Sequence, residues 1–167
     1  MALVSPISYY KLSAGQGVSD TWWKTGRITT KVTGGQTGGN FSQIESIDPC
    51  GTSTPVHSHR NEEESFYVLE GDVAVFVDGE WIELSAGDFA LIPRDTPHAY
   101  VVRSELARML VTFSPSGFEQ AFSELGVAVS RSPEPPIDTV LPSPEEMVAA
   151  FAAYGCEILG PPPALSS

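Results

Sequence analysis

The chain has 167 residues, with nine basic and 21 acidic side chains and a formal net charge of −12. A surface with this much negative charge repels phosphate backbones and anionic lipid headgroups. We therefore expect neither nucleic acid nor a membrane as a partner. The length suits one domain that buries a core without staples, and two cysteines, Cys50 and Cys156, are too few for a disulfide framework. The first residues lack the pattern of a secretory signal, and no segment has membrane-spanning length, so we expect a cytoplasmic protein with reduced thiols.

Short runs rich in Val, Ile, Phe, Tyr and Thr alternate with turn residues from about residue 27 to residue 113. This pattern predicts an all-β barrel or jelly roll built from antiparallel strands. The predicted strands are residues 27–33, 41–47, 65–70, 73–77, 81–84, 89–92, 98–103 and 106–113. Asp78-Gly79 marks the clearest hairpin, because Asp-Gly between apolar runs supplies the positive φ values of a type I′ turn. The glycine pairs at 34–35 and 38–39 bracket another turn.

The tail has a different composition, with eight of the 14 prolines between Pro133 and Pro163. Ser116 and Glu119 have the spacing of a helix capping box, and Gly126 can end that helix. Ser143-Pro144-Glu145-Glu146 repeats the signature, with proline at the first helical position. An apolar stripe that we expect to pack against the barrel follows, formed by Met147, Val148, Phe151 and Tyr154.

We therefore expect three regions along the chain. Residues 1–26 form an N-terminal arm, residues 27–113 form the barrel, and residues 114–167 form a helical, proline-rich tail that packs on the barrel. Residues 131–142 are the expected proline-rich connector within this tail.

His57, His59 and His98 are the only histidines of the chain. Alternate residues of a β-strand face the same side, so His57 and His59 would present two imidazoles on one face. A carboxylate run, Glu62-Glu63-Glu64, follows at once. Alternating histidines also occur on exposed strands, and a glutamate triplet is usually solvated surface. Three neutral imidazoles with one carboxylate nevertheless suit iron, nickel, manganese, cobalt, copper or zinc.

The residues around these side chains resemble the two sequence motifs of the cupin superfamily. The first motif, Gly-x5-His-x-His-x3,4-Glu-x6-Gly, fits at every fixed position, namely Gly51, His57, His59, Glu64 and Gly71. The second, Gly-x5-Pro-x-Gly-x2-His-x3-Asn, keeps Gly87, Pro93 and His98. It departs at Asp95, where the family has Gly, and at Val102, where it has Asn. Asp tolerates a left-handed turn, and neither departure touches a ligand position.

The resemblance implies an all-β double-stranded β-helix, the cupin jelly-roll barrel, with a short C-terminal helical tail. It also implies one divalent transition metal per chain, held by His57, His59, Glu64 and His98. Glu64 satisfies the spacing to both His59 and Gly71, whereas Glu63 would fit only the shorter spacing and leave the glycine one position late. Glu62 and Glu63 are then expected to be turn residues that face water.

A narrower resemblance concerns function. The segment from Phe66 to Gly71, the triplet from His98 to Tyr100 and the tail are similar to bacterial single-domain quercetin dioxygenases. This implies a metal-dependent dioxygenase that cleaves a flavonol-like or other enol aromatic substrate, with Glu64 as the catalytic proton acceptor. No histidine remains for a Ser-His or Cys-His pair, so the metal and Glu64 must carry any reaction. Strand parity suggests four substrate-binding residues, namely Phe66, Val68, Tyr100 and Gln43.

Two other functions stay open at this point. The same ligand set could serve a metal-dependent cyclase or isomerase of polyketide-like aromatics, or a non-enzymatic cupin that binds a small ligand or carries a structural metal. We also expect a homodimer, because Trp22 and Trp23 precede the first barrel strand and large aromatics are enriched at interfaces. Burial of this pair within one subunit is the alternative.

Overall fold

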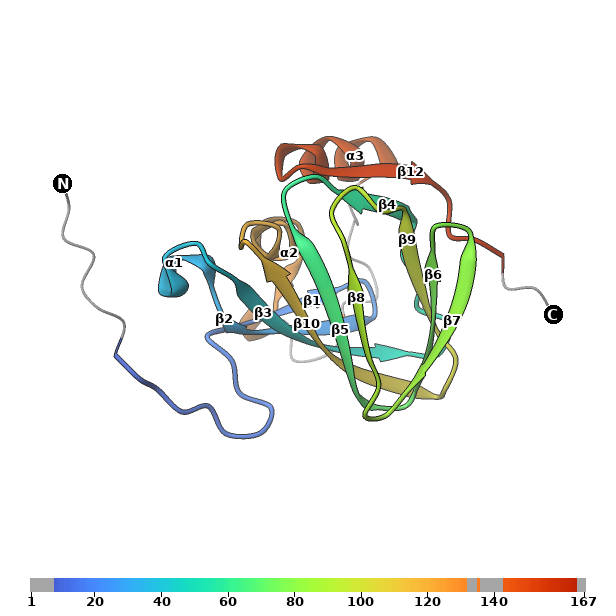
Figure 1. The fold of residues 1–167 in the computed structure, drawn as a ribbon. Helices are drawn as coiled ribbons and strands as arrows, with labels where there is room; N and C mark the ends of the chain where they lie inside the picture. The colour runs from blue at the N-terminus through green and yellow to red at the C-terminus, as the bar shows by residue number, and fades with distance from the viewer. Residues whose placement is uncertain (1–7, 132–134, 136–142, 165–167) are drawn as a thin grey trace.

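Two antiparallel β-sheets face each other and form the barrel in a computed structural model that describes residues 8–131, 135 and 143–164 (Figure 1). The first sheet contains, in spatial order, β11 (Val127–Ala128), β1 (Ser19–Trp23), β2 (Gly26–Val32), β3 (Ser42–Pro49), β10 (Leu106–Ser114), β5 (Glu63–Glu70) and β8 (Phe89–Ile92). The second contains β12 (Cys156–Gly160), β4 (Val56–His59), β9 (His98–Val102), β6 (Asp72–Val77) and β7 (Glu80–Ser85). This is the predicted jelly-roll architecture.

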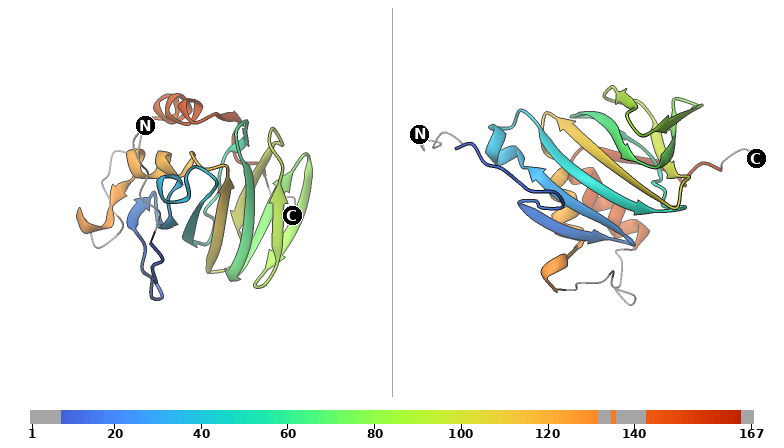
Figure 2. Two further views of the ribbon diagram at one scale, coloured as in Figure 1. Left: turned by 60° about the vertical axis from the view of Figure 1, so that its left-hand side comes forward. Right: turned by 90° about the horizontal axis from the view of Figure 1, so that it is seen from below.

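The helices of the described residues are short, and three of the four belong to the tail. They are α1 (Gly34–Thr37), α2 (Glu119–Leu125), the 3-10 helix η1 (Val129–Arg131) and α3 (Pro144–Ala153). Further views show α3 lying across one end of the barrel, next to β12 (Figure 2). None of the helices within the described ranges is long and apolar enough to cross a membrane.

The core lies between the two sheets, because alternate side chains of each strand point inward. Its most deeply buried members come from both sheets and include Phe66, Val68, Val73, Val75, Val102, Met109 and Phe113. Burial of each such side chain contributes roughly 1.5–3 kcal/mol relative to exposure. These contacts determine which face of each strand points inward, because a shift of one residue in the strand register would turn the apolar side chains toward water.

All eight predicted barrel strands are present, with bounds that differ by two residues or fewer. The Asp78-Gly79 hairpin is confirmed, with φ values of 47° and 94° that match a type I′ turn. Asp95 has a φ of 59°, as its tolerance of the left-handed region predicts. The turn bracketed by glycines at 34–35 and 38–39 contains the single-turn helix α1.

The ends of the chain contribute more strands than expected. The expected arm contains β1, which pairs with β2 along its whole length, so the sheet begins before residue 27. The tail contributes strands as well as helices, because β11 pairs with β1 and β12 pairs with β4. The connector expected at residues 131–142 lies, apart from Arg131 and Pro135, outside the described residues.

The two predicted capping boxes have different outcomes. Ser143 caps α3 as predicted, since its hydroxyl accepts from Glu146 N and Glu146 Oε2 accepts from Ser143 N. Ser116 does not cap α2, whose N-cap is Phe118. The Glu119 carboxylate is buried and accepts from the backbone N–H groups of Gly34 and Gly117 and from the Ser42 hydroxyl. Tertiary hydrogen bonds therefore replace the local cap at this helix.

Candidate metal centre

The three histidines come from two neighbouring strands of the five-stranded sheet. His57 on β4 lies directly opposite His98 on β9 in the strand register. His59 is two residues further along β4 and therefore shares the face of His57. Directly opposed residues of an antiparallel pair have Cβ atoms about 5 Å apart. The strand pairing alone thus gathers three imidazoles on one inner face.

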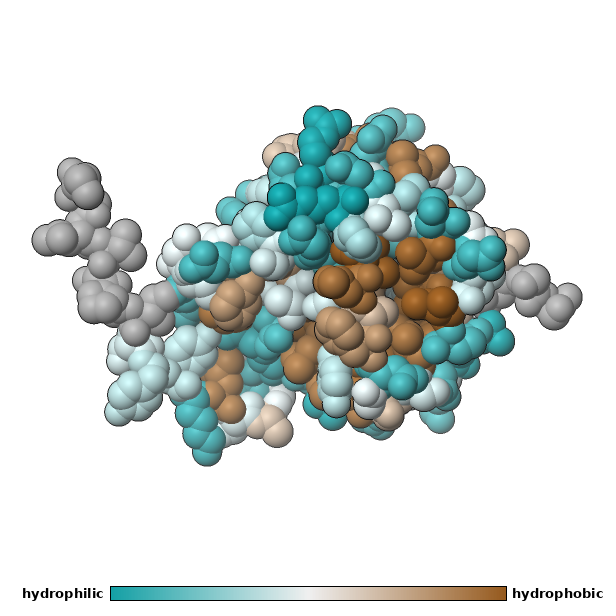
Figure 3. Space-filling view, in the orientation of Figure 1, coloured by the Kyte–Doolittle hydropathy of each residue, from teal (hydrophilic) through white to brown (hydrophobic). Residues whose placement is uncertain are grey.

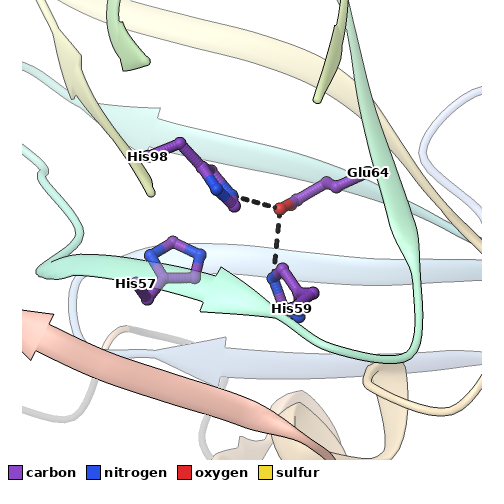
Figure 4. A group of neighbouring side chains, drawn as sticks. All are labelled: His57, His59, Glu64 and His98. Atoms are coloured by element: carbon purple, nitrogen blue, oxygen red, sulfur yellow. Dashed lines mark hydrogen bonds and ion pairs between the residues drawn. The ribbon is translucent and has the colours of Figure 1, made fainter. Parts of the chain in front are cut away.

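Glu64 reaches the same point from β5, in the facing sheet (Figure 4). Its Oε2 atom lies 2.8 Å from His98 Nε2 and 3.2 Å from His59 Nε2. One potential ligand atom from each of the four residues, His57, His59, Glu64 and His98, lies within 4.8 Å of the other three. The four predicted ligands are therefore together, and all four are buried.

The charges of these groups suit a metal ion. Burial, followed by the neighbouring His98, lowers the pKa of His57 to about 3, so its imidazole is neutral at physiological pH. Burial alone would raise the pKa of Glu64, but the adjacent rings of His59 and His98 hold it well below its usual range. Neutral imidazoles and an ionised carboxylate are the protonation states in which these side chains bind metals.

Backbone carbonyls orient two of the histidine rings. His57 Nδ1 lies 2.9 Å from the carbonyl oxygen of Pro55, and His98 Nδ1 lies 2.9 Å from that of Thr96. A carbonyl oxygen only accepts, so each Nδ1 carries the proton and donates it. The Nε2 lone pair of His57 is then free for a metal ion. His98 Nε2 instead lies 2.8 Å from Glu64 Oε2, and although burial opposes it, this carboxylate raises the pKa of His98, so a metal ion would displace the proton on Nε2. The donor set, its burial and its ring orientation all fit a divalent transition metal.

A cavity opens beside this centre between the two sheets and the tail helices. Its volume is about 70 Å³, which is below the range of about 300–1,000 Å³ common for small-molecule sites. His57 and Glu64 lie in its wall. Most of the other lining side chains are apolar or aromatic, among them Trp23, Ile28, Ile44, Phe66, Val111, Phe113, Phe118, Phe122, Met147 and Phe151.

Of the four residues expected to contact substrate, Phe66 and Tyr100 line the cavity. Val68 is fully buried in the core and is not part of the cavity wall. Gln43 does not line this cavity, because Ile44 and Ser46 are the residues of β3 that face it. Gln43 lies on the opposite face of that strand and donates to Thr112 Oγ1.

Sequence reasoning missed two buried carboxyl groups near the centre. Glu62 is only 2% exposed instead of facing water, because the residues leading into α2 cover it. No pattern in the residues near Glu62 predicts that its side chain is buried. Asp48 is equally buried and accepts a hydrogen bond from the Tyr100 hydroxyl at 3.1 Å. Correct parity on β3 would have identified Asp48, since it alternates with Ile44 and Ser46.

Residues 43–113 match the family model described as "Cupin domain". This segment of the chain is a cupin domain. This cupin is 37% identical over 90 residues to quercetin 2,3-dioxygenase of Bacillus subtilis, a match that covers 54% of this chain and 27% of that enzyme. It is 38% identical over 89 residues to polyketide synthase CurC of Streptomyces cyaneus, which covers 53% of this chain and 56% of that protein.

Solved structures agree on the fold. An RmlC-like cupin from Shewanella frigidimarina superposes with a TM-score of 0.57 at 23% identity, over 68% of this chain and 96% of that one. The curated relatives named above are matched over only 27% and 56% of their own length. The similarity therefore concerns only a part of each of these proteins.

Proposed function

We propose that this cupin is a metal-dependent dioxygenase that cleaves a flavonol-like or other enol aromatic substrate. The observation that carries the proposal is the buried centre of three histidines and one glutamate at the wall of an aromatic cavity. Identity to quercetin 2,3-dioxygenase of Bacillus subtilis across the barrel supports the choice of chemistry. A divalent ion held by four protein ligands would keep one or two positions open for substrate and dioxygen.

The side chains of the cavity suit a planar, acidic, apolar substrate. Glu64 is ionised, buried and turned toward the cavity, so its Oε2 atom can accept the proton of an enol bound beside it. The rings of Phe66, Phe113 and Phe118 form much of the wall and can pack against the faces and edges of an aromatic ligand. The same apolar wall excludes water from the reacting atoms.

The test uses metal-loaded protein, a flavonol and dissolved oxygen. We expect loss of the flavonol absorbance band in air with one equivalent of oxygen consumed, and a spectral shift without turnover under nitrogen. Glu64→Gln should abolish turnover and the shift, because the proton acceptor is gone. Glu63→Gln is the matched control, since Glu63 forms a surface ion pair with Arg94 at 3.0 Å and should leave turnover unchanged.

Two outcomes would contradict the proposal. Conversion of an enol or polyketide-like substrate without oxygen uptake would favour a cyclase or isomerase, which the similarity to polyketide synthase CurC supports. Full metal occupancy with neither a spectral shift nor turnover on any flavonol or related enol would favour a ligand-binding or structural role.

A further inference from the structure

His59 differs from the other two histidines of the centre in how its ring is held. The Nδ1 atoms of His57 and His98 each donate to a backbone carbonyl. Within the described residues, neither ring nitrogen of His59 has a hydrogen bond of good geometry, although Nε2 lies 3.2 Å from Glu64 Oε2. The ring is nevertheless almost fully buried, with only 2% of the residue exposed.

The carboxylate of Glu62 lies beside the Nδ1 atom of this ring. Its Oε2 atom lies 3.8 Å from His59 Nδ1, and both side chains are at most 2% exposed. Oε2 also lacks a hydrogen-bond partner among the described residues. A donor without an acceptor and an acceptor without a donor therefore face each other in the buried interior of the protein.

We propose that Glu62 is a positioning residue for His59, whose buried carboxylate accepts the Nδ1 proton when Nε2 binds the metal. The proposal rests on the metal site of the proposed function but not on its reaction. An imidazole that binds a metal through Nε2 must carry its proton on Nδ1, and a buried N–H needs an acceptor. A small shift of the ring would shorten the gap to the ~2.8 Å of a charge-assisted hydrogen bond.

The start of the C-terminal tail fixes the carboxylate in this position. The backbone N–H of Phe118 donates to Glu62, and Gly117 lies so close that a Cβ atom there would be 3.1 Å from Glu62 Oε1. The Phe118 ring packs edge-on against His59, with ring centroids 4.5 Å apart. The segment before α2 therefore places both the carboxylate and the ring.

The Glu62 carboxylate would affect metal binding by His59 in two ways. It selects the tautomer of His59 that leaves Nε2 free for the metal, and its negative charge makes that nitrogen a stronger ligand. Loss of such an outer partner typically weakens metal affinity by about 10- to 100-fold. Glu62 would thus set the affinity of the centre without touching the ion.

The test compares Glu62→Gln, which keeps the size and removes the charge, with the exposed neighbour variant Glu63→Gln. Zinc affinity is measured by competition with a chromophoric chelator, and nitrogen-15 NMR of the histidine rings follows each Nδ1–H in the zinc-loaded proteins. We expect zinc to bind Glu62→Gln about 10- to 100-fold more weakly and Glu63→Gln within about twofold of wild type. The His59 Nδ1–H resonance should move upfield in Glu62→Gln alone.

His57 and His98 serve as internal controls, because their Nδ1–H groups donate to backbone carbonyls and should not respond. Unchanged zinc affinity and an unchanged His59 signal in Glu62→Gln would overturn the proposal. Equal movement of all three histidine signals would also overturn it, because that pattern means general loss of structure. Zinc binding by the wild type tests the metal site itself, so failure of the proposed site and failure of this role are distinguishable.

Discussion

At the scale of single residues, the buried carboxyl group of Asp48 should make stability depend on pH. Burial raises its pKa from 3.8 to about 6 in the folded protein, so ionisation disfavours the folded state. The free-energy cost of ionising Asp48 in the folded protein is absent at pH values below its pKa in the unfolded chain. The cost is complete at pH values above its pKa in the folded protein. Its full size is about 3 kcal/mol, from roughly 1.4 kcal/mol per pKa unit.

Asp48→Asn removes this cost, so the variant should gain stability relative to wild type as pH rises from about 4 to 7. Urea unfolding of both metal-free proteins at several pH values measures the difference, and groups common to both proteins cancel. A difference in unfolding free energy that stays constant across this range would show that Asp48 keeps an ordinary pKa.

The residues at the centre differ in how far the sequence could predict them. His57, His59, Glu64 and His98 follow a motif whose spacing reflects strand parity, and the structure brings them together. Glu62 could not be placed from its neighbours, because the segment that buries it lies more than 50 positions away along the chain. Burial of a polar group by a distant element leaves no local pattern.

At the scale of elements, two turn glycines provide a matched comparison. Gly71, between β5 and β6, has a φ of 81°, and a Cβ atom there would overlap the backbone oxygen of Leu106. Gly87, between β7 and β8, has a φ of 96°, but a Cβ atom there would meet nothing within 4 Å. Both positions strain an L-residue, but only Gly71 is also crowded.

We therefore expect Gly87→Ala to cost about 1–2 kcal/mol of unfolding free energy, from backbone strain alone. Gly71→Ala should cost about 1–3 kcal/mol more, because the backbone must move to admit the methyl group. Thermal or urea unfolding of the two variants gives the comparison. Equal losses of unfolding free energy in both variants would mean that crowding at Gly71 does not destabilise the fold.

The elements also show what sequence patterns could predict. The barrel strands were found because Val-, Ile- and aromatic-rich runs end at Gly, Pro or Asp turns. β12 was missed because its five residues follow a helix and precede a proline run, and its partner β4 lies about a hundred positions earlier. Long-range pairing of this kind is decided by the assembled fold and not by propensity.

At the scale of the whole molecule, an apolar patch lies on the outer face of β5 and β8 (Figure 3). Tyr67, Leu69, Phe89 and Leu91 form it, with 38–60% of each residue exposed. β8 is also the last strand of its sheet. Trp23, by contrast, packs within the chain against Phe122 and Phe151, so we expect the predicted homodimer to use the outer face instead.

Light scattering should report a dimer mass at micromolar concentration for the wild type. Leu91→Lys should shift the protein toward monomer, because a charge would have to be buried at the contact. Val148→Lys is the control, since Val148 is similarly exposed but lies on α3, away from the patch. A wild type that is monomeric under these conditions would contradict the expected homodimer.

The pairing of β4 with β12 has a consequence for how the protein is made. β4 carries two of the four expected ligands, and its partner strand is Cys156–Gly160, with Cys156 opposite His59 and Ile158 opposite His57. A chain that has left the ribosome as far as His98 already contains all four side chains but lacks the strand that holds this pair in place. The ion should therefore be acquired after residues 156–160 have been synthesised, from the cellular metal pool available to a nearly folded barrel.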